Sequence, residues 1–334
     1  MTHLSASINQ APPPDWDRFN QNWQASDLSP YFYQSMVNVG RGITLCVEAG
    51  GNPDNPPLLF ITGFGSQMLF WSDAFLKRFM DAGFFVIRFD NRDTGLSTKI
   101  KHLTKLPHTN ILKMIVKNQI GLSNAREKVA YTLPDMADDV AGLIDAMNLG
   151  KTHLVGASMG GMIAQIVCAK YPHHTHKLTL LFSSTNHPFL LPPKPKEFST
   201  FFKKAQSNSE RDMLRHAVWF MTAVGSPGHL DIKGTRHIAS VRYHRCHHPL
   251  GMAQQMNAIL ATGSIFKYTR QIIAPTLIIH GNKDGLLHQS HGKHIAKIIP
   301  NSQFVGVDGM AHDLPVYYQP YLASLIIRHL SSQV

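Results

Sequence analysis

Residues 152–163 have the sequence THLVGASMGGMI, in which Gly156, Ser158 and Gly160 form a complete Gly-x-Ser-x-Gly pentapeptide. The apolar run before the pentapeptide predicts a strand and the residues after it predict a helix, which is the setting of a nucleophilic serine. The two glycines allow this tight turn to close without a clash. The N–H of Met159 would then point at a reacting carbonyl oxygen, beside the positive end of the helix. We therefore expect Ser158 to be a nucleophile; the alternative is a glycine-rich corner with an incidental serine.

Short apolar runs alternate with helical patterns on both sides of this turn, from about residue 35 onward. Thr132, with Asp135 three residues later, predicts a helix start, and a second helix is expected over residues 159–171, ending at Pro172. The alternation predicts an α/β fold, with a mostly parallel central sheet flanked by helices. The expected strands are residues 43–48, 58–61, 85–89, 153–155, 178–182, 276–280 and 303–307.

The alternation of strands and helices stops after Ser184 and resumes at Pro275. Helical patterns around 197–207, 209–222 and 250–262 lie between, and we find no convincing strand among them. This stretch predicts a helical cap inserted over the carboxyl edge of the sheet. The proline-rich, polar start of the chain predicts a loose arm. The expected parts are an N-terminal arm (1–34), a first core segment (35–185), the helical cap (186–268) and a second core segment (269–334).

A serine nucleophile needs a base and an acid that orients the base. Asp284 follows the strand expected at 276–280, and His312 follows the strand expected at 303–307. Both lie in loops at the carboxyl ends of strands, so we expect His312 as the base and Asp284 as the acid. The rival acids, which we expect to support turns instead, are Asp90, Asp308 and Asp313.

The negative charge that develops on the substrate oxygen needs a second backbone donor besides the N–H of Met159. The strand expected at 58–61 runs into Gly63, Phe64 and Gly65. Because the glycines free the backbone, we expect the N–H of Phe64 to complete an oxyanion hole. The alternative is an ordinary turn after a strand.

Five stretches of the chain together resemble the α/β-hydrolase superfamily of serine hydrolases, and the resemblance is greatest to bacterial esterases of the aclacinomycin methylesterase type. It implies an α/β-hydrolase fold, the order serine, acid, histidine along the chain, and ester hydrolysis as in an esterase or lipase. The chain has Thr62 where members often have histidine; since the donor is a backbone N–H, we expect no loss. A serine nucleophile argues against haloalkane dehalogenases and epoxide hydrolases, which use aspartate. The five stretches are residues 63–65, 90–97, 156–161, 281–284 and 309–312.

The same residues suit two other reactions, perhydrolysis like that of cofactor-free haloperoxidases and hydrolytic C–C cleavage. A third alternative is a non-catalytic ligand-binding protein on a hydrolase fold. Neither a phosphate-binding glycine loop nor a dinucleotide fingerprint is present, so we expect no cofactor. The histidine-rich stretches 173–176 and 244–248 lack the spacing of a zinc finger, and we expect no metal site.

The composition favours a protein of the cytoplasm. Three cysteines in 334 residues argue against a disulfide framework, and the N-terminus does not have the pattern of a signal peptide. The sequence has no apolar run long enough to predict a transmembrane helix.

The excess positive charge lies in two segments, residues 99–128 with a balance of +6 and residues 186–268 with +7, and the rest of the chain sums to −2, which gives the net charge of +11. We find no nucleic-acid-binding motif and expect no nucleic-acid partner. We expect a small-molecule ester as substrate. A positive rim around the site would favour anionic esters or peripheral contact with an anionic lipid surface, for which residues 111–117 could supply an amphipathic helix. The alternative is lysine scattered for solubility.

Overall fold

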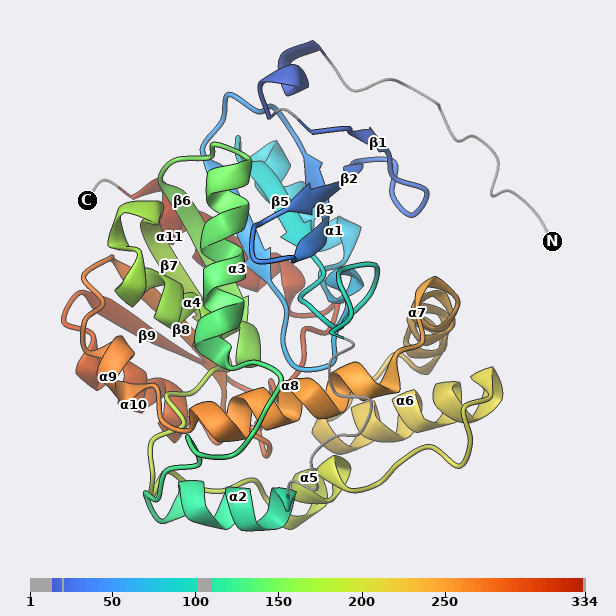
Figure 1. Ribbon diagram of the computed structural model, residues 1–334, viewed down its shortest axis with the longest axis vertical. Coiled ribbons are helices and arrows are strands. Elements are labelled where there is room, and N and C mark those ends of the chain that lie inside the picture. Colours follow the sequence, from blue (N-terminus) through green and yellow to red (C-terminus); the bar gives the residue numbers. More distant parts are fainter. Residues whose placement is uncertain (1–13, 20, 101–109, 333–334) are drawn as a thin grey trace.

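The protein forms a single central sheet covered by helices on both faces (Figure 1). The structure is a computed structural model that describes residues 14–19, 21–100 and 110–332. The sheet has nine strands in the order β1-β2-β3-β5-β4-β6-β7-β8-β9. The pairs from β1 to β5 in this order are antiparallel and those from β5 to β9 are parallel. The expected α/β architecture with a mostly parallel sheet is therefore confirmed.

Every strand that the sequence predicts overlaps an observed strand. The strands are β1 Gln24–Ala25, β2 Tyr33–Asn38, β3 Thr44–Gly50, β4 Pro57–Ile61, β5 Phe85–Phe89, β6 Thr152–Ala157, β7 Thr175–Leu181, β8 Thr276–Gly281 and β9 Ser302–Val307.

The helices include both of those expected around the pentapeptide. The backbone N–H of Thr132 donates to Asp135 at 2.7 Å, so the expected helix start is observed. The α-helices are α1 Asp73–Asp81, α2 Ile111–Gln119, α3 Leu133–Ala146, α4 Met159–Lys170, α5 Pro195–Phe198, α6 Glu210–Val224, α7 Ile232–Arg245, α8 Pro249–Thr262, α9 Phe266–Thr269, α10 Ser290–Ile298 and α11 Gln319–Ser331, and the 3-10 helices are η1 Pro14–Phe19, η2 Met68–Phe70, η3 Pro172–His174 and η4 Ser199–Phe201.

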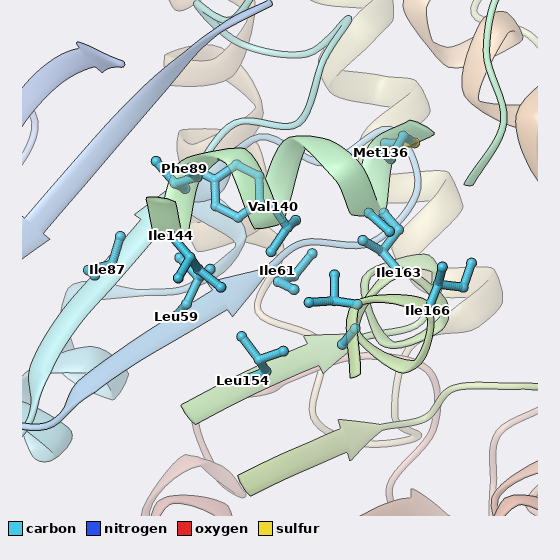
Figure 2. Packing of buried hydrophobic residues seen from close by; sticks show 14 of the residues in the cluster. Leu59, Ile61, Ile87, Phe89, Met136, Val140, Ile144, Leu154, Ile163 and Ile166 are labelled. Atoms are coloured by element: carbon cyan, nitrogen blue, oxygen red, sulfur yellow. The ribbon is translucent and has the colours of Figure 1, made fainter. Parts of the chain in front are cut away.

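Two apolar layers hold the helices to the sheet. Helices α3 and α4 pack on one face, where Val140 and Ile163 lie against Ile61 (Figure 2). Helices α1 and α11 cover the other face. Burying one such aliphatic side chain stabilises the fold by about 1.5–3 kcal/mol. The central strands, buried on both faces, are therefore held firmly, and so are the loops at their carboxyl ends.

Residues 14–19 and 21–34 differ from the loose arm that the proline-rich composition predicts. Trp16, Phe19 and Trp23 are buried, and Trp16 packs edge-on against Phe85 of β5. The pairing of β1 with β2 extends the sheet at its edge. Three large aromatic side chains within eight residues bury more apolar surface than a detached arm could, which offsets the cost of ordering the segment. Residues 1–13 and 20 of the expected arm lie outside the described residues.

Helices α5 to α9 all lie between β7 and β8, in the stretch where the sequence predicts a cap (Figure 1). Helix α7 was not expected, because its sequence IKGTRHIASVRYHR carries polar residues on every side and a glycine near its start. The regular structure near residues 197–207 is shorter than expected and consists of α5 and η4. Within the described ranges, none of the helices combines the length and hydrophobicity needed to cross a bilayer.

Candidate active site

Ser158 lies at the sharp turn between β6 and α4. Its backbone has φ 54° and ψ −119°, in a region that residues with a side chain rarely adopt. The turn tolerates no side chain at the flanking glycines. A Cβ on Gly160 would lie 2.2 Å from the carbonyl oxygen of Ile61, and one on Gly156 would lie 2.5 Å from that of Gly160. The serine side chain is thereby held at the carboxyl edge of the sheet, where it is partly exposed.

His312 reaches Ser158 from the loop after β9. Ser158 Oγ lies 3.0 Å from His312 Nε2, within hydrogen-bond distance. The backbone N–H of His312 donates to the carbonyl of Val224 at 3.0 Å, and the ring packs edge-on against Phe182 with centroids 4.9 Å apart. Phe182 itself has a φ of 36°. These contacts fix the imidazole in the orientation that faces the serine.

Asp284 lies on the other side of the imidazole. Its Oδ2 is 2.8 Å from His312 Nδ1, and its Oδ1 accepts from the backbone N–H groups of Leu286 at 2.9 Å and Leu287 at 2.8 Å. Burial opposes ionisation of this carboxyl, but the charge of His312 and hydrogen bonds from His280 and His312 outweigh burial and lower its pKa. Asp284 is therefore an ionised acceptor. The hydrogen bond to it places the imidazole proton on Nδ1 and leaves the Nε2 lone pair facing Ser158.

A second histidine that the sequence analysis did not single out also contacts the acid. His280, at the end of β8, is fully buried, and its Nε2 lies 3.2 Å from Asp284 Oδ2 and 2.7 Å from the carbonyl oxygen of Leu287. A shared N–H therefore holds the carboxylate against its loop. The spacing of four residues between His280 and Asp284 is visible in the sequence, but with twenty histidines in the chain it carries little weight.

The loop after β4, which carries the expected donor Phe64, lies against the serine. A Cβ on Gly63 would lie 3.2 Å from Ser158 Cβ, so the two residues are in direct contact. The N–H of Gly65 donates to the side-chain carbonyl of Gln255 at 2.9 Å, and Gln255 is fully buried in α8. Helix α8 thus holds this loop in place. Met159, the other expected donor, is the first residue of α4.

The rival carboxylates have other partners. Asp90 forms a buried ion pair with Arg245 of α7 and accepts from the N–H of Met68 at 2.8 Å. Asp308 accepts from the side chain of Asn282 at 2.7 Å. These contacts brace loops and tie α7 to the core, so neither carboxylate contacts the imidazole of His312.

Asp313 directly follows His312 in the sequence, and its pKa shifts in the opposite direction from that of Asp284. It accepts from the N–H and the hydroxyl of Ser226, and burial raises its pKa. The Ser226 hydroxyl also accepts from the N–H of Ala311 at 2.9 Å. Ser226, two residues beyond the end of α6, thus holds the loop that carries His312 in place.

The described part of the chain contains no group of three or more histidine, cysteine or acidic residues placed to hold a metal ion. In the two histidine-rich stretches, His174 Nε2 lies 3.3 Å from Asp145 Oδ1, and His244 Nε2 lies 3.2 Å from Glu210 Oε1.

Comparison with known proteins agrees with the fold described above. A family model described as alpha/beta hydrolase fold matches residues 56–316. Rhodomycin D methylesterase of Streptomyces peucetius is 24% identical over 314 residues, covering 86% of this chain and 95% of that protein. The poly(3-hydroxyalkanoate) depolymerase of Ectopseudomonas oleovorans is 24% identical over 307 residues, covering 91% and 94%. The crystal structure of the enol-lactonase from Burkholderia xenovorans superposes with a TM-score of 0.66 at 15% identity and covers 89% of this chain and 100% of that chain.

Proposed function

The chain belongs to the α/β-hydrolase family, and we propose that it hydrolyses carboxylic esters through an acyl-enzyme on Ser158. The observation that carries this proposal is the pair of contacts that His312 makes, 3.0 Å from Nε2 to Ser158 Oγ and 2.8 Å from Nδ1 to Asp284 Oδ2. The similarity to a methylesterase over 86% of the chain supports an ester as the substrate.

In the proposed mechanism, Ser158 Oγ attacks the ester carbonyl carbon while His312 Nε2 takes the serine proton. The imidazolium that forms is stabilised by Asp284, whose lowered pKa keeps it ionised. The tetrahedral intermediate collapses, the C–O bond to the alcohol breaks, and His312 returns the proton to the departing alcohol. Water then attacks the acyl-enzyme with His312 again as base, which releases the acid and restores the Ser158 hydroxyl.

The negative oxygen of the intermediate would be held by the backbone N–H groups of Met159 and Phe64. Support comes from the position of Met159 at the start of α4 and from the contact between Gly63 and Ser158. One such donor contributes about 3 kcal/mol to lowering the barrier in a protease.

The test uses p-nitrophenyl esters from acetyl to palmitoyl with the wild type and Ser158→Ala. We expect a burst of p-nitrophenol in the wild type, and a loss of turnover of ~10⁶-fold in the variant, as in a protease that loses its triad serine. Ser184→Ala is the matched control, because Ser184 is a buried serine 2.7 Å from another histidine, His291, at the same edge of the sheet. Ester turnover that survives in Ser158→Ala and disappears in Ser184→Ala would overturn the proposal.

The alternatives give different results in the same preparations. A non-catalytic ligand-binding protein shows neither burst nor turnover with any ester in the series. A perhydrolase shows Ser158-dependent oxidation of a halide when acetate and peroxide are supplied together.

A further inference from the structure

Helix α2 carries a stripe of exposed apolar side chains. Leu112, Val116 and Ile120 follow one another at intervals of four residues and so lie on one face of the helix. Their exposed fractions are 54%, 51% and 54%, and Leu122 just beyond is 53% exposed. Large aliphatic side chains gain nothing for the fold by facing water, and several together mark a surface that binds something.

The loop before α5 extends this stripe. The N–H of Phe189 points at the carbonyl of Gln119 at 3.4 Å, and the Gln119 side chain donates to the carbonyl of Leu190 at 2.9 Å. Phe189 is 79% exposed with a φ of 68°, a left-handed conformation that is unusual for an aromatic residue, and Leu191 is 52% exposed. We call the combined apolar face the α2 surface; it consists of Leu112, Val116, Ile120, Leu122, Phe189 and Leu191.

Exposed positive charge lies in α2 and in the loop that follows it. Residues 111–128 contain the basic residues Lys113, Lys117, Arg126 and Lys128 against the single acid Glu127. Only Lys117 pairs with that acid, at 3.4 Å, while Lys113, Arg126 and Lys128 are exposed. Residues 186–192 carry no charged side chain of either sign, counting histidine as neutral. A helix with an exposed apolar face and lysine beside it has the composition of one that lies in the interface of an anionic membrane.

The inner face of α2 connects this surface to the proposed catalytic residues. Met114 is buried against Met256 and Leu260 of α8, and Phe64 packs against the same cluster. The Asn118 side chain also donates to the carbonyl of Leu260 at 3.0 Å. Figure 1 shows α2 on the outer side of α8, away from the sheet. The α2 surface therefore lies over the same end of the sheet as Ser158.

We propose that the α2 surface docks on anionic lipid bilayers and presents the site to esters dissolved in or attached to the membrane. The exposed Lys113, Arg126 and Lys128 attract the protein to negatively charged headgroups, and the α2 surface then enters the interface between headgroups and acyl chains. Access to esters at the membrane matters only if the protein hydrolyses esters, so this inference rests on the function proposed above. The docking itself requires no catalysis and is measured separately.

The experiment sediments the full-length protein with vesicles of phosphatidylcholine alone or of phosphatidylcholine with phosphatidylglycerol. We expect binding to the vesicles that contain phosphatidylglycerol, weakened by salt, and little binding to phosphatidylcholine. The double variant Leu112→Ser, Val116→Ser and the single variant Phe189→Ser should each lower the ratio of bound to free protein about tenfold or more. Lys113→Gln should lower it about fivefold.

Ile273→Ser is the matched control, because Ile273 is 76% exposed just before β8, at the opposite edge of the sheet, and should bind like the wild type. Hydrolysis of p-nitrophenyl acetate, which dissolves in water, should be unchanged in all four variants, and this also shows that they are folded. Hydrolysis of a p-nitrophenyl palmitate carried in the phosphatidylglycerol vesicles should fall with the binding.

Three results would overturn the docking proposal. The first is equal binding to both kinds of vesicle, and the second is binding that Lys113→Gln and Phe189→Ser leave unchanged. The third is an oligomer in lipid-free buffer that Leu112→Ser, Val116→Ser dissociates, since the α2 surface would then be a contact between copies of this chain. A protein that binds vesicles but hydrolyses no ester would leave docking intact and contradict only the proposed function.

Discussion

Replacing Asp284 by asparagine removes one charge and leaves the shape of the side chain almost unchanged. The carboxylate accepts four N–H groups: those of Leu286 and Leu287 on Oδ1, and those of His280 and His312 on Oδ2. An amide has only one acceptor oxygen. If this oxygen stays with the two backbone donors, the amide NH₂ faces two ring nitrogens that were donating to the carboxylate.

The loss on the histidine side sets the magnitude. A hydrogen bond to a charged group contributes about 1.5–3 kcal/mol, so two of them amount to about 3–6 kcal/mol. To accept from the new amide, His312 Nδ1 must give up its proton, and Nε2 then carries the proton and cannot act as base toward Ser158. A tenfold change in rate corresponds to about 1.4 kcal/mol, so the two lost hydrogen bonds alone amount to a fall of about 10²–10⁴-fold. Because the imidazole is also held in the wrong tautomer, we expect turnover to fall by the upper figure, ~10⁴-fold, as for the equivalent change in a serine protease.

The assay is turnover of p-nitrophenyl acetate by Asp284→Asn, with Asp308→Asn and Asp313→Asn as carboxylate controls in the neighbouring loop. Circular dichroism of each variant reports whether it is folded. Asp308→Asn should stay within a fewfold of the wild type, because Asp308 meets Asn282 and not the imidazole. A folded Asp284→Asn variant with more than a tenth of wild-type turnover, or a crippled Asp308→Asn, would refute the reasoning.

Two further predictions concern buried histidines. Because His280 positions the carboxylate of Asp284 through one hydrogen bond, His280→Phe should lower kcat about tenfold at unchanged KM. His280→Gln keeps a donor near the position of Nε2 and should restore most of kcat. Equal losses of kcat in both variants would show that His280 has only a structural role. Burial, together with the nearby His176 and Lys177, lowers the pKa of His153 from 6.5 to about 3. Between these two pH values, His153 is protonated in the unfolded chain and neutral in the folded protein. The free energy of unfolding therefore falls as the pH drops from 6.5 toward 3. The loss due to His153 should reach about 2 kcal/mol near pH 5 and be absent in His153→Phe, measured by urea unfolding near pH 7.5 and near pH 5; identical pH dependence in both proteins would contradict it.

The sequence does not predict helix α7 or strands β1 and β2, because each is stabilised by residues elsewhere in the chain. Helix α7 has polar residues all round, and its stability comes from contacts such as the ion pair of Arg245 with Asp90, a residue 155 positions away. Strands β1 and β2 follow a proline-rich start, and they join the sheet through the pairing of β2 with β3 and through the packing of Trp16 on Tyr33 and Phe85. Periodicity reports which face of a segment is apolar, not which distant residue will cover it.

The turn at Ser158, in contrast, can be predicted from the local sequence alone. The positive φ of Ser158 and the bare Cα atoms of Gly156 and Gly160 are local requirements of a strand that turns directly into a helix, so a single pentapeptide predicts them. Most of the seven strands that the sequence predicts are apolar runs buried on both faces, which composition alone identifies. The exception is β9 at the edge of the sheet, which is only partly buried. From these runs the sequence also predicts that Asp284 and His312 lie in loops at the carboxyl ends of neighbouring parallel strands.

By itself, then, the sequence determined the α/β fold, the turn at Ser158 and the loops that carry His312 and Asp284, because each follows from the pattern of a short segment. Only the tertiary structure decided which carboxylate meets the imidazole, since Asp284, Asp308 and Asp313 all lie within six residues after a strand end and differ in the partners that the fold brings to them. It also decided that His280 holds the acid, that Gln255 holds the loop beside Ser158, and that the apolar face of α2 stays uncovered. These contacts join residues from separate elements, and their distances depend on how the sheet and its helices pack.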